Sequence, residues 1–304
     1  VERMSMSSIR NTGGVREAKP VFRLGHFSSR RILRVFYHLF MLALAFTMIY
    51  PFLWAVTSSF KTSGQMFSGN PLTLIPNPST LVNYERTLEL LPFISFMRNS
   101  IILSISIPAL MILFSSLCAY ALARLEFRGR NVIFILFVAT MMVPSHVTLI
   151  PNYTIVSRLG WIDSYICLFV NMIFTSANAF NIFFFRQYFM SIPKDLENAA
   201  IIDGCSHAGI YFRIVLPNSK PAIATVAILS FRTVWNSFLW PMLVINSFDK
   251  MTVTVGLQYY RSAVDNSTQV LAGVTLAIIP VIIVFLIFQR QFINSTVNSG
   301  FGGT

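Results

Sequence analysis

The chain has 304 residues, of which 55% are hydrophobic and only 11% are charged, and its mean hydropathy is +0.65. Soluble domains average about 25% charged residues, so this chain has too little charge to cover a water-exposed globule, and much of its surface must face lipid. A net charge of +12 could suggest nucleic-acid binding. The basic residues, however, cluster between long apolar runs, which is typical of membrane proteins. We therefore expect an all-α integral membrane protein that binds no nucleic acid.

Six apolar segments are each long enough to cross a hydrocarbon core, which takes about 20 residues. They cover residues 35–58, 100–123, 132–150, 165–185, 222–245 and 270–288. The first apolar run is too long for a cleavable signal peptide, so we expect it to be retained as a span. The sequence thus predicts six transmembrane helices.

The stretches between these segments complete the predicted layout. A basic segment, 1–34, precedes the first span, 35–58, and a loop rich in turn formers follows over 59–96. We expect one short helix in that loop, near Tyr84–Leu91. The membrane core then runs over 97–289 and includes a long polar loop, 191–221, before a tail over 290–304.

Lysine and arginine are distributed unevenly among these stretches. They concentrate in the leader, in the loop between the second and third segments, and in the loop between the fourth and fifth. Cytoplasmic loops are enriched in these residues. The bias therefore predicts that both termini and loop 191–221 lie in the cytoplasm, and that loop 59–96 lies outside.

No pattern of catalytic or metal-ligating residues is present in the sequence. It contains no Ser/His/Asp constellation, no HExxH and no glycine-rich phosphate loop. The three cysteines and four histidines lack ligand spacing: Cys118, Cys167, Cys205, His26, His38, His146 and His207. We expect no catalytic residue, no metal site and no cofactor site in this chain. If ATP drives this protein, another chain binds it.

Loop 191–221, "SIPKDLENAAIIDGCSHAGIYFRIVLPNSKP", predicts a short helix, a turn and a second helix. Gly204 is a natural end for the first helix, and Ser206 can cap a second that runs to Leu216, before Pro217. The first helix has four residues at i, i+3, i+4 and i+7 on one face, and its two alanines permit close approach of another surface: Leu196, Ala199, Ala200 and Asp203. Local chemistry alone would equally fit a surface hairpin that merely joins two spans.

The full pattern of the loop resembles the EAA loop of binding-protein-dependent ABC importers. That motif reads E-A-A, three residues, G, nine residues, then I-x-L-P. Six positions match it in register: Ala199, Ala200, Gly204, Ile214, Leu216 and Pro217. The stretches "FNIFFFRQYFMSIP" and "FRTVWNSFLWPMLVI", and the tail "AIIPVIIVFLIFQRQFINSTVNSG", are similar to the smaller permease of the maltose-type sugar branch. The resemblance implies a type I ABC importer permease fold.

The resemblance also implies partners and a role for the loop. The family assembles two homologous permeases, two ATPase subunits that bind ATP and Mg²⁺, and an external solute-binding protein, in the bacterial inner membrane. The loop would couple this chain to an ATPase through Glu197, Asn198, Ala199, Ala200, Asp203, Gly204, Ile214, Leu216 and Pro217. Asn198 occupies the position of the motif's glutamate, so either the neighbouring Glu197 substitutes for it or the contact is neutral.

Three residues of the fifth segment are candidates for the solute pathway: Arg232, Trp235 and Asn236. Arg232 lies about 16 Å into the segment at 1.5 Å per residue, near the middle of the membrane. A charge there costs at least about 2.5 kcal/mol and is a functional candidate. It would either pair with the partner permease or face the cavity and attract an acidic saccharide. Trp235 also fits a membrane-interface role.

Two alternatives remain open. Peptide importers, and importers of other solutes, share the EAA loop but usually lack the W-N-x-F-L-W-P stretch found here. A secondary transporter would need ion-binding groups near the midplane, often carboxylates, and every acidic residue of this chain lies outside the six segments. The sequence therefore favours a permease subunit that imports a sugar or oligosaccharide.

The predicted orientation can be tested by labelling single cysteines with a membrane-impermeant thiol reagent in intact cells. We expect a cysteine at Asn77 to be labelled and one at Gly129 to be protected, because the basic residues place Gly129 inside. Labelling at Gly129 and protection at Asn77 would invert the topology and contradict the cytoplasmic placement of loop 191–221.

Overall fold

The computed structural model describes residues 26–68, 73–263 and 266–301, and the regular structure in these ranges is entirely helical. The chain divides into two compact units, residues 1–52 and 53–304, with the division inside helix α1 (His26–Ser59). The predicted all-helical class is therefore confirmed. The basic leader, 1–34, lies mostly outside the described residues.

The first unit contains most of α1, in which every side chain from Leu33 to Ile49 is exposed. Leu42 is 68% exposed and Met48 is 65% exposed. A helix that is apolar all round is suited to lipid. The stretch Leu33–Ser59 is long and apolar enough to cross a membrane, as the sequence predicted.

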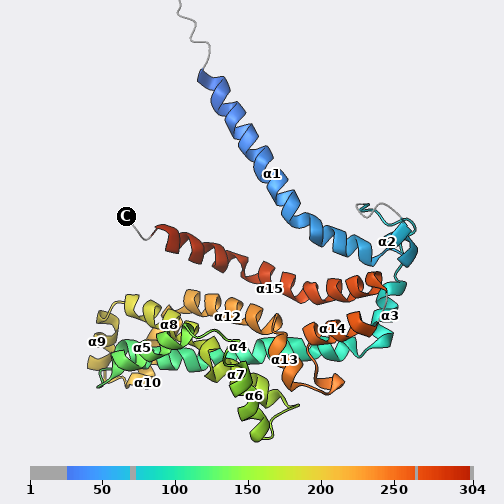
Figure 1. Ribbon diagram of the computed structural model, residues 1–304. Helices are drawn as coiled ribbons and strands as arrows, with labels where there is room; N and C mark the ends of the chain where they lie inside the picture. Colours follow the sequence, from blue (N-terminus) through green and yellow to red (C-terminus); the bar gives the residue numbers. More distant parts are fainter. Residues whose placement is uncertain (1–25, 69–72, 264–265, 302–304) are drawn as a thin grey trace, which may run out of the picture. The chain divides into compact units, whose positions relative to one another are not determined.

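The second unit is built around α4 (Phe93–Arg124), which packs along α8 (Ala179–Ser191) and α12 (Lys220–Trp235) (Figure 1). Helix α15 (Ser267–Phe301) lies against α12 and α3 (Val82–Leu90), and α3 confirms the short helix predicted in loop 59–96. The remaining α-helices are α2 (Ser63–Ser68), α5 (Arg130–Met141), α6 (Leu149–Arg158), α7 (Tyr165–Phe174), α9 (Asp195–Ile202), α10 (His207–Ile210), α11 (Leu216–Asn218), α13 (Leu239–Val244) and α14 (Val253–Ala263). Helix α15 continues through most of the predicted tail, 290–304.

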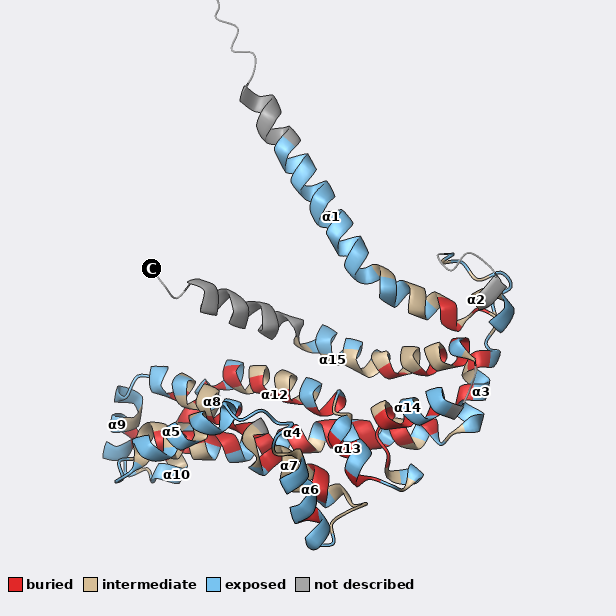
Figure 2. Cartoon of the chain, viewed as in Figure 1, coloured by how far each residue is buried: buried red, intermediate tan, exposed pale blue. Residues whose placement is uncertain are grey.

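Two apolar cores form around α4, and Figure 2 shows the buried residues concentrated on the helices that surround it. The first core contains Phe96, Met111 and Trp240. The second core contains Phe185, Phe189, Ala200, Tyr211 and residues from the last turns of α4. The second core therefore joins the loop 191–221 to the α4–α8 pair.

Three of the predicted spans are not continuous helices. The third, 132–150, ends as α5 at Met141, because Pro144 lacks an N–H and its ring obstructs a continuing helix. Helix α5 is about 18 Å long at 1.5 Å per residue, too short to cross alone. The chain then turns and begins α6 at Leu149.

The fourth and fifth predicted spans are bent or broken. In the fourth, α7 and α8 meet at 44° across the turn Ser176–Asn178. The fifth ends as α12 at Trp235 and resumes as α13 at Leu239. In the described part of the chain, three helices are long and apolar enough to cross a membrane, or five if each bent pair counts as one span. The length and composition of these helices therefore do not confirm the predicted number of six transmembrane spans.

Polar side chains fasten the connections to the helices. Asn99 on α4 donates to the carbonyl oxygens of Asp249 and Met251, at 2.7 and 3.1 Å, and the hydroxyl of Ser100 accepts the N–H of Val253 at 2.7 Å. These bonds satisfy backbone groups that the irregular segment before α14 leaves without helical partners.

Asp163 makes a second tie, between the α6–α7 connection and the segment after α13. One carboxylate oxygen accepts the N–H groups of Asn246 and Ser247, both at 2.9 Å, and the other lies 3.0 Å from Nζ of Lys250. The bonds from Ser247, with those from Lys250 and Asn246, hold the pKa of Asp163 well below its usual value. Asp163 therefore stays ionised and holds the two connections together.

The packing of α14 against α4 predicts a cost for any side chain at Gly256. A Cβ there would lie 2.2 Å from Cδ2 of Phe96, whose ring is fully buried and has no room to withdraw. We expect Gly256→Ala to destabilise the fold by about 1–3 kcal/mol, the usual cost of overpacking. The measurement is the thermal unfolding midpoint in detergent, with Gly64→Ala as a control because nothing lies within 4 Å of a Cβ at Gly64. Equal midpoints for the two variants would contradict this packing.

Candidate functional site

The loop 191–221 folds into the predicted helical hairpin. Its first helix, α9, ends in a glycine-stabilised turn: the N–H of Gly204 donates to Ile201 O at 3.0 Å, and the N–H of Cys205 donates to Ala200 O at 2.9 Å. Gly204 has φ +79°, a conformation that side chains with a Cβ adopt at a cost. The pair of bonds is a Schellman motif, which requires a residue in this left-handed region.

The second helix of the hairpin begins at the predicted cap. The hydroxyl of Ser206 accepts the N–H of Gly209 at 3.2 Å. The helix continues from α10 through a π-helical turn, Tyr211–Val215, to Asn218. It therefore ends two residues later than Leu216, the end predicted from Pro217, and it meets α12 at 77°.

The two alanines of α9 face in different directions. Ala200 is 6% exposed and packs in the second core, whereas Ala199 is exposed. The expectation that both present one face to another surface therefore does not match the structure.

Most of the surface of α9 is exposed, and it carries both apolar and polar side chains. Leu196, Ile201 and Ile202 are 46%, 53% and 86% exposed, and Asn198, Ala199 and Asp203 are exposed beside them. Adjacent exposed apolar side chains on a polar loop mark an interaction surface. We call these six residues the hairpin face.

The other predicted coupling residues lie on the inner side or at the end of the hairpin. Ile214 and Leu216 are partly buried against the second core, and Pro217 is exposed. Glu197 points into the chain, where its carboxylate lies 2.9 Å from Nε of Arg124. Asn198 is exposed, and it lines the same hollow beside Arg124 as Glu197 does.

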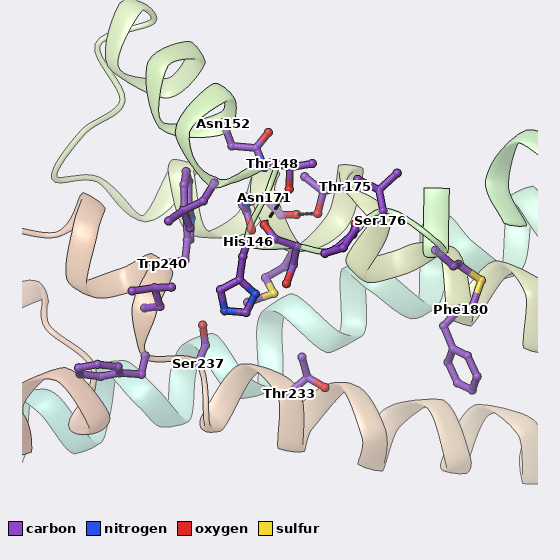
Figure 3. Close-up of a pocket in the computed structure, with 18 residues that line it drawn as sticks. His146, Thr148, Asn152, Asn171, Thr175, Ser176, Phe180, Thr233, Ser237 and Trp240 are labelled. Carbon is purple, nitrogen blue, oxygen red and sulfur yellow. Dashed lines mark hydrogen bonds between the residues drawn. The ribbon is translucent and has the colours of Figure 1, made fainter. Parts of the chain in front are cut away.

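A second feature is a hollow of about 650 Å³ among α5, α6, α7 and α12. Figure 3 shows its polar side chains around one space, with Thr233 and Ser237 on one side and Thr148, Asn152 and Asn171 on the other. Its further lining is Met141, Val143, Pro144, Ser145, His146, Leu149, Met172, Thr175, Ser176, Phe180, Phe238, Leu239 and Trp240. We call this space the polar hollow.

Several lining groups are free to bind a ligand. Within the described residues, the side-chain amides of Asn152 and Asn171 and the hydroxyl of Ser237 have no hydrogen-bond partner. Trp240 is fixed, because its indole N–H donates to Cys167 O at 3.1 Å. The polar hollow therefore offers amides and hydroxyls beside an oriented aromatic ring, which is how small-molecule sites are commonly built.

The three predicted pathway residues lie outside the lining of the polar hollow. Trp235 is buried against Phe231 and lines an apolar groove beside α4 and α15. Arg232 and Asn236 are exposed, and the Asn236 amide donates to Arg232 O at 2.9 Å. Their neighbours Thr233, in α12, and Ser237, two residues after the end of α12, line the hollow.

Sequence reasoning missed most of the polar hollow, because its residues come from the breaks in the predicted spans. The available signals were Pro144 and the polar run Thr175–Asn178, which interrupt apolar segments. Among the described residues, no group of three or more His, Cys, Asp or Glu side chains could hold a metal ion.

Comparisons with known proteins agree on one family. Residues 111–297 match the model of the binding-protein-dependent transport system inner membrane component. The chain is 36% identical to an arabinooligosaccharides transport system permease protein of Halalkalibacterium halodurans, with 86% of this chain and 93% of that protein aligned. It is 31% identical to the sn-glycerol-3-phosphate transport system permease protein of Pectobacterium atrosepticum, over 89% of this chain and 98% of that one.

A solved structure has the same fold. It is a chain of a bacterial ABC transporter involved in the import of the acidic polysaccharide alginate, with TM-score 0.77 and 26% identity. The likeness covers 88% of this chain and 99% of that chain. The predicted type I ABC permease fold is therefore confirmed at the level of the fold.

The turn that ends α9 predicts a specific effect of removing its glycine. We expect Gly204→Ala to destabilise the turn by about 1–2 kcal/mol, the cost of left-handed backbone for an L-residue, although nothing obstructs the added Cβ. Amide hydrogen exchange over Ala199–Cys205 should then rise about 5–30-fold. Gly209→Ala is the control, because its Cβ would make only ordinary contacts, the nearest 3.5 Å away. Unchanged exchange in Gly204→Ala would show that the turn does not depend on this glycine.

Proposed function

Since this chain belongs to the family of binding-protein-dependent transport system inner membrane components, we propose that it is one permease subunit of an ATP-driven importer of a sugar or oligosaccharide. It forms half of the translocation pathway beside a second, homologous permease. Two separate ATPase subunits bind ATP and Mg²⁺ and perform the hydrolysis. An extracytoplasmic solute-binding protein delivers the solute.

In this proposal the chain is a multi-pass protein of the bacterial inner membrane, with six spans and both termini in the cytoplasm. Helices α1, α4 and α15 each cross once, the pair α7–α8 supplies a bent crossing, and α12 followed by α13 supplies another. The segment that begins with α5 and turns at Pro144 is the remaining crossing. Irregular backbone at membrane depth is tolerated where it lines a water-filled cavity, and this break lines the polar hollow.

The observation that carries the sugar assignment is the chemistry of the polar hollow. A saccharide presents many hydroxyl groups with few charges, and it is matched by amides and hydroxyls that both donate and accept hydrogen bonds. Asn152, Asn171 and Ser237 supply such groups, and the largely buried Trp240 forms part of the wall beside them. The relative that transports arabinooligosaccharides supports the same class of solute.

An acidic oligosaccharide is the finer version of this proposal. The guanidinium of Arg232 has no ion-pair partner among the described residues, and it sits next to Thr233 of the hollow. Guanidinium binds a carboxylate with two parallel hydrogen bonds. The structural relative that imports alginate, an acidic polysaccharide, supports this version.

The hairpin face is the proposed contact with the ATPase. Its exposed leucine and isoleucines fit an apolar socket, and the two helices of the hairpin are anchored in the second core. The resemblance to the EAA loop assigns this contact to the ATPase subunit. Retention of the ATPase by the tagged permease pair after detergent purification tests the assignment, and its absence would contradict it.

Uptake assays on paired threonine variants test the polar hollow. Thr233 and Thr225 both lie on α12 and donate to the carbonyl four residues earlier, at 2.9 and 3.0 Å, but only Thr233 lines the hollow. We expect Thr233→Val and Asn171→Leu to slow uptake about five- to tenfold, since one lost hydrogen bond to solute is worth about 1–1.5 kcal/mol. Thr225→Val should transport normally.

The same assay separates the two classes of solute. Arg232→Gln should reduce uptake of an acidic oligosaccharide and leave that of its neutral counterpart unchanged. Normal uptake in Thr233→Val and Asn171→Leu would contradict the hollow as the pathway. Equal effects of Arg232→Gln on both solutes would contradict the acidic version alone.

A further inference from the structure

Arg124, the last residue of α4, has a buried side chain that reaches two other helices. Its side chain is 3% exposed. One nitrogen, Nη2, donates to the carbonyl oxygens of Phe189 and Ile192, the latter at 2.6 Å, at the C-terminal end of α8. Another nitrogen, Nε, lies 2.9 Å from the carboxylate of Glu197 in the first turn of α9. One guanidinium therefore joins α4, α8 and α9.

Each of these contacts suits arginine in particular. The carbonyl of Phe189 accepts one backbone bond, from the N–H of Ile192 at 3.1 Å, and can accept a second from Arg124. A cation at this end of α8 also interacts favourably with the helix dipole. A guanidinium donates in several fixed directions, whereas an ammonium is a compact point charge. A buried cation also requires an anion, which Glu197 supplies with its side chain only 13% exposed.

Helix α9 has few other attachments to the chain. Of its eight residues, Ala200 is the one that is buried, and the apolar residues Leu196, Ile201 and Ile202 are turned outward. The second helix of the hairpin has its own ties to α4, from Tyr120 to His207 O at 3.3 Å and between Ser116 and Tyr211 at 2.8 Å. Besides the packing of Ala200 in the second core, the side chain of Glu197 therefore ties the first helix to α4 and α8.

Helix α8 connects this contact to the polar hollow. Its C-terminal end meets Arg124, and Phe180, near its N-terminal end, lines the hollow. With 13 residues, α8 spans about 20 Å at 1.5 Å per residue. A displacement of α9 that is passed to α8 through Arg124 would therefore reach the solute site along one short helix.

We propose that Arg124 is a positioning residue whose pairing with Glu197 makes α9 move with α4 and α8 as one body. This inference rests on the proposed contact between the hairpin face and an ATPase. It also assigns different roles to the two polar residues before Ala199. Glu197 is used inside the chain, and Asn198 makes a neutral contact with the ATPase.

The test uses the complete complex, with the partner permease and ATPase, reconstituted in proteoliposomes with its binding protein and a labelled oligosaccharide that it transports. The variants are Arg124→Gln, Arg124→Lys and Glu197→Gln. The matched control is Arg128→Gln, because Arg128 is an exposed cation in the adjacent loop with no ion pair among the described residues. The quantity measured is the number of ATP molecules hydrolysed per solute molecule taken up, at saturating binding protein.

We expect Arg124→Gln and Glu197→Gln to lose uptake at least about tenfold while ATP hydrolysis stays within about twofold, so the ratio rises about fivefold or more. Arg124→Lys should recover only part of the loss, and Arg128→Gln should match the wild type. If uptake and hydrolysis fall in proportion, the pair only stabilises the fold and the proposal is overturned.

A normal ratio of ATP hydrolysed to solute taken up in Glu197→Gln would also overturn the proposal. If the Arg124 variants do not assemble, Glu197→Gln alone tests the proposal, because this variant keeps the bonds from Arg124 to α8. A failure of the proposed function looks different. In that case the wild-type chain itself retains no ATPase, and the proposed role of Arg124 is overturned with it.

Discussion

The hydrocarbon core of a membrane contains no water, so every backbone N–H and C=O group there must find a partner inside the protein. This constraint explains why the described chain is helical and why its long helices, α1, α4 and α15, are apolar over most of their length. It also explains why the irregular segment before α14 is tied to Asn99 and Ser100. Polar side chains are placed where the backbone leaves a helix.

Breaks in the helices are costly in such a medium, and here three of them converge. The turn at Pro144, the bend at Thr175 and Ser176, and the break before Leu239 all contribute to the polar hollow. Carbonyl and N–H groups freed at a break can bind water or solute in a cavity, where lipid could not satisfy them. The three breaks therefore lie around the polar hollow because a cavity can satisfy the backbone groups that each break frees.

Charged side chains near the helix ends also bond backbone groups that the helices leave without partners. Asp163 and Arg124 are charged side chains that each bond several backbone or side-chain groups at once. Asp163 fixes connections between helices, and Arg124 fixes the start of the hairpin to the ends of α4 and α8. A charge that satisfies several partners holds its surroundings in one geometry, because moving any partner loses a charge-assisted contact. At Arg124, whose side chain is buried, it also leaves the charge uncompensated.

The sequence by itself determined the class of the protein and the register of its hairpin. Scarce charge and long apolar runs are properties of composition, and the hairpin signals, Gly204 and Ser206, act through backbone bonds within a few residues. The family followed from a motif read along the same loop. These features depend on residues that are close together in the chain, so they can be predicted from the sequence without knowledge of the fold.

The tertiary structure alone decided which side chains meet. Hydropathy could not distinguish a straight span from two short helices around Pro144, because both are equally apolar. It could not show that Ala200 turns inward while Ala199 turns outward, or that Thr233, rather than Trp235, lines the hollow. The partner of Glu197 lies 73 residues earlier in the chain, at Arg124. Contacts of that range depend on how α4, α8 and the hairpin pack together, and packing is a property of the folded chain rather than of any local pattern.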